Sequence, residues 1–97
     1  MNTYPVRCVW IVEVLFPNEE PEIYVFKTRY QAFNLFIRLK LLIDYKYSEH
    51  ISYQSNISKF KGDAAYGLFD LPISLRLYKK QFTYDTKEII KERKTKL

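Results

Sequence analysis

The sequence predicts an α+β protein with a small antiparallel sheet of three or four strands covered by one long helix. Two patterns predict it: apolar residues alternate with a period of two over residues 6–16, and they recur at three- and four-residue spacing over residues 29–47. The expected order of elements is β-β-α-β-β-α, ending in a short basic helix. The length of 97 residues, 47% of them apolar, predicts a single α+β domain over residues 1–85, followed by a basic C-terminal helix or tail over residues 86–97.

The first two expected strands form a hairpin. The alternating residues between Val6 and Phe16 are mostly β-branched or aromatic, which favours a strand. The second face of this strand is only partly polar, so we expect it to be central in its sheet or covered on both sides. Acidic, turn-rich residues 17–22 then lead to a second β-rich run over residues 22–27. The first strand is expected to supply Trp10, Val12 and Val14 to the core.

A long helix is expected from Arg29 to Tyr47. Thr28 and Gln31 have the spacing of a capping box, in which the Thr28 hydroxyl accepts from the Gln31 amide. At about 1.5 Å rise per residue the helix would be roughly 30 Å long, which is enough to cross and cover a small sheet. Its expected inward stripe consists of Ala32, Leu35, Phe36, Leu39, Leu42 and Ile43, widened by Phe33, Ile37 and Leu41.

The second half of the chain carries weaker patterns. Apolar and polar residues alternate over residues 51–57, which predicts a half-exposed strand. Residues 61–67 contain both glycines of the chain and are expected to form a loop. Alternation over residues 73–82 predicts a last strand with a basic outer face, and a helix that begins at Pro72 is the alternative.

The net charge of +5 comes entirely from the C-terminal end of the sequence. Residues 1–75 hold eight basic and eight acidic side chains, whereas residues 76–97 hold eight basic and three acidic ones. Asp85 and Glu88 have capping-box spacing there, which predicts the short basic helix. Basic residues that alternate with aromatic ones are typical of surfaces that neutralise phosphates and stack bases, although a solvated face and a tail explain the same pattern. The candidate partner-binding residues are Arg76, Tyr78, Lys79, Lys80, Lys87, Lys91, Arg93 and Lys94.

No catalytic or metal-binding pattern stands out in the sequence, and no cofactor is expected. Cys8 is the only cysteine and His50 the only histidine, and a buried structural thiol and a histidine at the end of a helix explain them better than a catalytic dyad. One cysteine and one histidine are too few ligands for a zinc site. The glutamates of residues 17–22 lack the spacing of a calcium loop, and the glycines match no phosphate-binding loop. We therefore expect a protein that is not an enzyme.

Composition indicates a compartment and a kind of function. A lone cysteine predicts a reducing, cytoplasmic environment, and the N-terminal apolar run has neither the pattern of a secretory signal nor the length of a membrane span. Phe, Tyr, Met, Ile, Asn and Lys, whose codons are AT-rich, number 41, whereas Gly, Ala, Arg and Pro number 14, a bias common in phages and mobile elements. We expect an accessory or inhibitory protein of such an element that binds a host protein or nucleoprotein. Direct binding of DNA or RNA through the basic C-terminal strand and helix is the alternative.

Overall fold

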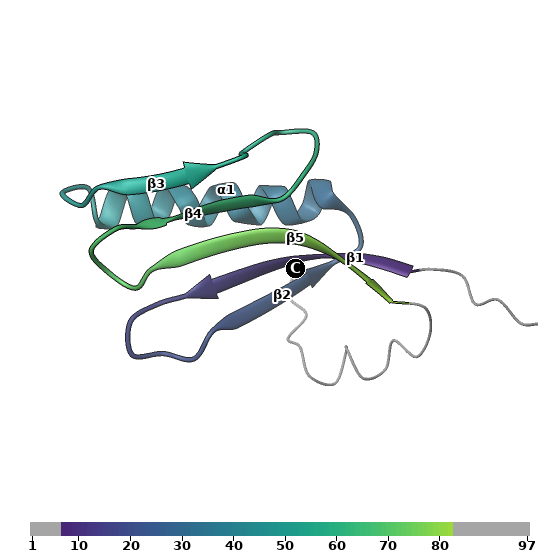
Figure 1. The fold of residues 1–97 in the computed structure, drawn as a ribbon, viewed down its shortest axis with the longest axis horizontal. Coiled ribbons are helices and arrows are strands. Elements are labelled where there is room, and N and C mark those ends of the chain that lie inside the picture. The colour runs from purple at the N-terminus through teal and green to yellow at the C-terminus, as the bar shows by residue number, and fades with distance from the viewer. Residues whose placement is uncertain (1–6, 83–97) are drawn as a thin grey trace, which may run out of the picture.

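The computed structural model describes residues 7–82, which form one five-stranded sheet and one helix (Figure 1). In chain order the elements are β1 (Arg7–Leu15), β2 (Glu22–Phe26), α1 (Arg29–Lys46), β3 (Ser52–Ser55), β4 (Ala64–Leu68) and β5 (Ser74–Phe82). The predicted α+β class is confirmed. The sheet has five strands instead of the expected three or four.

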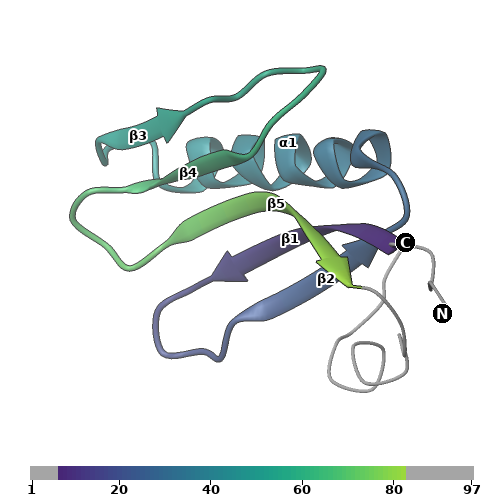
Figure 2. The ribbon, with the colours of Figure 1, turned by 45° about the vertical axis from the view of Figure 1, so that its right-hand side comes forward.

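The sheet is antiparallel throughout, and its strand order is β2-β1-β5-β4-β3. β1 forms the expected hairpin with β2, in which Trp10 lies opposite Phe26. On its other side β1 pairs along its whole length with β5, so that Arg7 lies opposite Phe82. The first and last described strands therefore lie side by side in the interior of the sheet (Figure 2).

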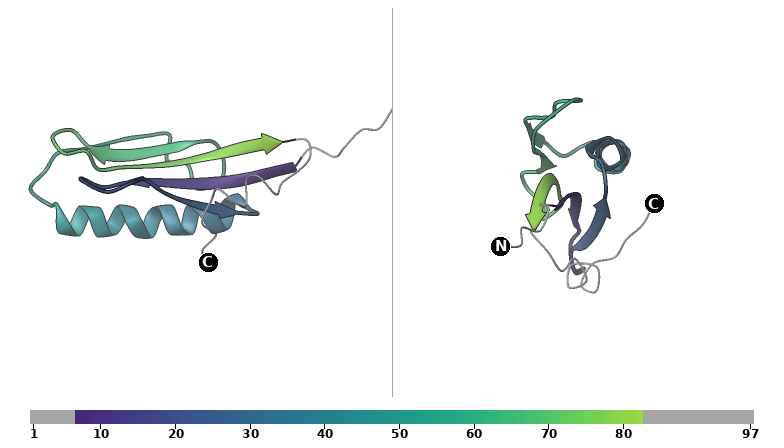
Figure 3. Two further views of the ribbon diagram at one scale, coloured as in Figure 1. Left: turned by 90° about the horizontal axis from the view of Figure 1, so that it is seen from below. Right: turned by 90° about the vertical axis from the view of Figure 1, so that its right-hand side faces the viewer.

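α1 begins where the sequence predicts, because Thr28 caps it. The Thr28 hydroxyl oxygen accepts from the Gln31 backbone N–H at 3.2 Å. The helix runs nearly along the strands on one face of a curved sheet (Figure 3). Its buried residues, Ala32, Phe36 and Ile43, lie at helical spacing and face the strands.

The core lies between α1 and the sheet face that contains Val12 and Tyr66. Burial of apolar side chains from both layers is the main source of stability in such a two-layer arrangement. Trp10 and Leu39, which we expected in this core, are partly buried and pack against it. The buried set is Val12, Val14, Phe26, Ala32, Phe36, Ile43, Ala64, Tyr66, Leu68, Ile73, Leu75 and Leu77.

The opposite face of the sheet is also largely apolar in its centre. Ile11 has 0% of its surface exposed, and on this face it lies between Val25 of β2 and Tyr78 of β5. β1 is therefore a central strand, as the partly apolar character of its second face predicted.

The prediction of a loop over residues 61–67 holds for residues 61–63 and is wrong for residues 64–67, because Ala64–Leu68 form β4. This strand pairs with β3 on one side and with β5 on the other. Position 67 of this strand is a glycine because no side chain fits there. A Cβ atom at this position would lie 2.6 Å from the Tyr53 hydroxyl oxygen and 2.7 Å from the Ile73 carbonyl oxygen. Gly67, which contributed to the prediction of a loop, is instead required by the close packing of this strand against Tyr53 and Ile73.

β5 confirms the strand predicted over residues 73–82 and excludes the alternative helix from Pro72. The inward stripe predicted for α1 is too wide, because Leu41 and Leu42 are exposed. The expected C-terminal helix over residues 86–97 lies outside the described residues. In the part of the chain that the structure describes, no helix combines the length and the apolar character needed to cross a membrane.

Candidate binding surface at the basic end of the sheet

The charged side chains of the described residues separate along the length of the sheet. Basic residues lie where α1 begins and near where β2, β3 and β5 end, and acidic residues lie near the other ends of these elements. Figure 1 shows that the start of α1 and the ends of these three strands lie at the same end of the sheet. The basic end comprises Lys27, Arg29, Lys59, Lys61, Lys79 and Lys80, with Asp63 as an acidic neighbour. The acidic end comprises Glu19, Glu20, Glu22, Glu49 and Asp70, with Lys46 as a basic neighbour. Because the chain crosses repeatedly between the two ends, the even charge balance of residues 1–75 hides this separation.

Arg29 ties the start of α1 to the connection between β3 and β4. Its Nη2 donates to the carbonyl oxygens of Ser58 at 2.6 Å and Lys61 at 3.2 Å. Nη1 donates to the carbonyl of Lys59 at 2.9 Å, and Nε donates to that of Gly62 at 3.1 Å. An arginine can make this set of bonds because its planar group carries five N–H donors. The connection is thereby held against the helix through its backbone.

Local hydrogen bonds shape residues 58–62, which we call the 58–62 loop. The Ser58 hydroxyl oxygen accepts from the backbone N–H groups of Phe60 at 3.1 Å and Lys61 at 3.3 Å. Gly62 has a φ of 89°, a conformation that suits glycine. Four carbonyl groups of the loop accept from the Arg29 side chain. The Phe60 side chain is 82% exposed and lies in the sequence between two exposed lysines, Lys59 and Lys61. The loop therefore presents an aromatic ring and two positive charges to solvent.

Trp10 connects Arg29 to β5. The guanidinium carbon of Arg29 lies 5.7 Å from the centre of the Trp10 ring and 5.0 Å from that of Phe33. The Lys79 ammonium nitrogen lies 5.8 Å from the centre of the same Trp10 ring. Burial lowers the pKa of the Arg29 guanidinium, and the nearby Asp63 carboxylate opposes this shift. Arg29, Trp10 and Lys79 form one packed unit of the basic end.

The predicted partner-binding residues of β5 lie on both faces of the sheet. Arg76, Tyr78 and Lys80 are on the face opposite α1, whereas Lys79 is on the same face as the core. The Arg76 guanidinium lies 4.8 Å from the centre of the Tyr78 ring and pairs with the Glu13 carboxylate at 3.2 Å. The other predicted residues, Lys87, Lys91, Arg93 and Lys94, lie outside the described residues.

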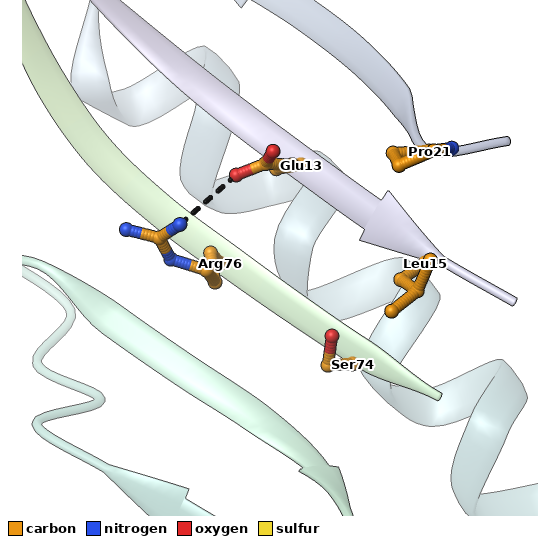
Figure 4. Close-up of a pocket in the computed structure, with 5 residues that line it drawn as sticks. All are labelled: Glu13, Leu15, Pro21, Ser74 and Arg76. Carbon is orange, nitrogen blue, oxygen red and sulfur yellow. Dashed lines mark hydrogen bonds and ion pairs between the residues drawn. The ribbon is translucent and has the colours of Figure 1, made fainter. Parts of the chain in front are cut away.

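An open hollow lies beside this ion pair on the face opposite α1 (Figure 4). It has a volume of about 180 Å³ and is lined by Glu13, Leu15, Pro21, Ser74 and Arg76. Figure 4 shows Arg76 reaching from β5 to Glu13 on β1. Because the two charged groups pair with each other, the hollow offers little charge for recognising a ligand.

Comparison of this chain with protein-family models, with curated proteins and with solved structures finds no match. Its function is therefore argued from the site alone.

Cys8 and His50 lie towards opposite ends of the sheet, which argues against a catalytic dyad. Cys8 is exposed near the start of β1, so the expectation of a buried thiol is wrong. His50 precedes β3 at the acidic end, where its Nδ1 lies 2.8 Å from a carboxylate oxygen of Asp70. Its ring also meets that of Tyr47 edge-on, with 5.9 Å between the ring centres. Over residues 7–82, no three potential metal-ligating side chains come together.

The 58–62 loop was not among the binding residues predicted from the sequence. The run Lys59, Phe60, Lys61 is a signal that was present, since it combines an aromatic residue with two lysines. Its significance depends on Arg29, which is about 30 residues earlier in the chain and contacts the loop only in the folded protein.

Proposed function

We propose that this protein is a non-enzymatic binding protein whose basic end engages the nucleic acid of a nucleoprotein partner or nucleic acid alone. The observation that carries the proposal is the separation of charge, which places six basic side chains around the start of α1 and the ends of three strands. A phosphate backbone is a biological polyanion that such a cluster can neutralise.

The exposure of these groups supports the proposal. Lys27, Lys59, Lys61 and Lys79 are all exposed, so they can reach phosphates with little reorganisation of the fold. Exposed charges interact through solution within a Debye length of about 8 Å at physiological salt, so binding through these lysines should weaken as the salt concentration rises.

A salt titration tests the proposal. Affinity for an oligonucleotide is measured at several salt concentrations for the wild type and for the double variant Lys59→Gln/Lys61→Gln. The matched control is Arg38→Gln/Lys46→Gln, which removes the same charge from exposed positions of α1 away from the loop. Each lysine that neutralises a phosphate contributes about one unit to the slope of log affinity against log salt, so the first variant should lose about two units.

The control should bind with the slope of the wild type. Equal slopes for all three proteins would show that the basic end does not contact the backbone, and the proposal would be abandoned.

A protein partner is the second candidate, favoured by a separate observation. Leu41, Leu42 and Tyr45 are exposed on the outer side of α1, where they form an apolar group unusual for a surface helix. Capture of partners with and without nuclease separates the two candidates. A partner that survives nuclease treatment and is lost in Leu41→Ser/Leu42→Ser would favour the helix. The accessory or inhibitory role in a phage or mobile element remains a hypothesis from composition.

A further inference from the structure

The 58–62 loop is the part of the basic end with the most specific chemistry. Phe60 is 82% exposed, and the Lys59 ammonium nitrogen lies 5.6 Å from the centre of its ring. Exposed aromatic rings occur elsewhere in this protein, such as Phe69 at 71% exposed, but Phe60 lies between two lysines, and this combination favours a ligand that is both planar and anionic. Nucleotides combine these two properties.

We propose that the basic end binds single-stranded nucleic acid, with an unpaired base stacked on the Phe60 ring and the flanking phosphates held by Lys59 and Lys61. The inference rests on the proposed function and narrows its ligand from nucleic acid in general to single strands. Aromatic side chains for stacking and positive charges along the backbone are the two features common to proteins that bind single strands.

The geometry favours a single strand over a duplex. In a duplex the faces of the bases are already stacked, so a projecting phenyl ring gains no contact with them. Direct reading of a duplex requires a helix or a β-ribbon that inserts polar side chains into a groove. The exposed positions of α1 include Gln31, Asn34 and Arg38 as well as Leu41, Leu42 and Tyr45, so the preference for a single strand rests on the projecting Phe60 ring and not on α1.

Arg29 acts as a positioning residue for this contact. Its four hydrogen bonds to loop carbonyls, together with the two bonds accepted by the Ser58 hydroxyl, hold the loop before any ligand arrives. A loop that is already ordered loses less conformational freedom on binding, which favours affinity. Arg29 itself is turned towards the protein, so its charge is not required to contact the strand.

The test is fluorescence anisotropy with a labelled oligonucleotide of about 12 nucleotides, a length within the usual site size, offered as a single strand and as a duplex. Wild type, Phe60→Ala and Phe60→Tyr are compared, and Tyr45→Ala is the control for loss of an exposed ring, since Tyr45 is 86% exposed on α1. Phe60→Ala should weaken single-strand binding about 5- to 150-fold, the range expected for one stacked base, and should leave the salt slope unchanged.

Phe60→Tyr should restore single-strand affinity because the tyrosine ring also stacks, and Tyr45→Ala should bind as the wild type does. Phe60 is exposed, so Phe60→Ala should fold normally, which far-ultraviolet circular dichroism checks. Arg29→Lys provides a second measurement: it keeps the charge but removes the planar fork, and should weaken single-strand binding with no change in the salt slope.

The outcomes separate this inference from the proposed function. If the wild type binds neither form of the oligonucleotide, both are overturned. If it binds through the basic end but Phe60→Ala has the affinity of the wild type, or if the duplex is preferred, stacking on Phe60 is overturned and electrostatic binding stands. If Phe60→Ala binds nucleic acid with unchanged affinity, the exposed Phe60 ring would instead be expected to contact a different partner, such as an apolar pocket of another protein.

Discussion

Arg29 joins parts of the molecule that are far apart in the sequence. Its guanidinium bonds to the 58–62 loop and also lies over the ring of Trp10 in β1. Hydrogen bonds from a charged donor are stronger than those between neutral groups. A lysine at this position would keep the charge, but its three donors on one nitrogen cannot reach the same set of carbonyls.

Arg29→Lys is therefore expected to lower the free energy of unfolding by about 0.5–1.5 kcal/mol, since two partly buried carbonyl bonds and two exposed ones would be lost or weakened. Urea denaturation followed by the fluorescence of Trp10, the only tryptophan, measures this directly. Arg38→Lys is the matched control because Arg38 is exposed on α1, and it should change stability by less than about 0.5 kcal/mol. Equal effects of the two substitutions would show that the Arg29 bonds contribute nothing specific.

Tyr24 is a second residue whose surroundings have a measurable effect. Burial, and then the hydrogen bond that its hydroxyl donates to the Glu22 carboxylate, raise the pKa of Tyr24 to about 12. The pKa of an unfolded tyrosine is about 10. Between these values the folded protein keeps a proton that the unfolded chain has lost. Tyr24 therefore contributes stability below about pH 10 that is lost as the pH rises towards 12.

The prediction is that Tyr24→Phe reduces the loss of stability between about pH 10 and pH 12. The measurement is the urea midpoint of both proteins across this range. Tyr45→Phe serves as the control because Tyr45 is 86% exposed. If Tyr24→Phe and the wild type lose stability in parallel, the Tyr24 contact with Glu22 has no effect on folding.

Among the elements, α1 shows that an apolar pattern predicts the helix correctly but does not predict which of its apolar residues are buried. Phe36 is 0% exposed and Leu42 is 62% exposed, although both belong to the stripe predicted to face the sheet. Phe36→Ala should therefore lower the free energy of unfolding by about 3–5 kcal/mol through lost burial and the cavity left behind. Leu42→Ala should change it by less than about 1 kcal/mol, because its side chain buries little surface. Thermal or urea denaturation of the two variants checks the assignment, and similar losses would mean that Leu42 is also buried.

The elements that the sequence predicted best are those whose pattern is local. β1, β2, α1 and β5 each carry the period of their own structure, and the Thr28 cap marks where α1 begins. β4 could not be recognised in this way, because its short run of mostly small residues has no strand pattern of its own. It forms a strand because it pairs with β3 on one side and with β5 on the other. Gly67 lies against Tyr53, which belongs to β3, so the reason for the glycine is in another element.

The same distinction applies to the candidate site. The excess of lysines after residue 75 is visible in the sequence, and it led to the prediction of Lys79 and Lys80, which lie at the basic end. Lys59 and Lys61 were overlooked because acidic residues nearby in the sequence balance them. In the fold Asp63 stays beside these lysines, but Glu49 and Asp70 lie at the other end of the sheet, so only the three-dimensional arrangement shows the excess of positive charge.

At the scale of the whole molecule, the two ends of the sheet carry opposite charge. Such an arrangement should orient the protein in the field of a polyanion before contact, with the basic end leading. The last described residue of β5, Phe82, lies at this same end. The basic residues that follow Phe82 in the sequence are therefore attached to the basic end of the sheet.

Removal of the residues after Asp85 should weaken nucleic-acid binding and lower the salt slope. The truncation deletes Lys87, Lys91, Arg93, Lys94 and Lys96 and leaves the whole described sheet in place. The remaining basic end should still bind, so the truncated chain should keep part of its salt dependence. A salt titration of both chains measures this. Equal affinity and equal slope would show that residues 86–97 take no part in binding.

The pairing of β1 with β5 also affects how the protein is made. Residues of β1 meet partners that lie roughly 60–75 residues later in the chain, so this pairing cannot form until nearly all of the described residues have been synthesised. At about 5–20 residues per second, β1 spends on the order of 3–15 s with β2 on one edge and an unpaired, apolar edge on the other. That edge is a template for pairing with other chains. This unpaired edge makes the nascent protein prone to aggregation during synthesis, and the pairing of β1 with β5 ends that period.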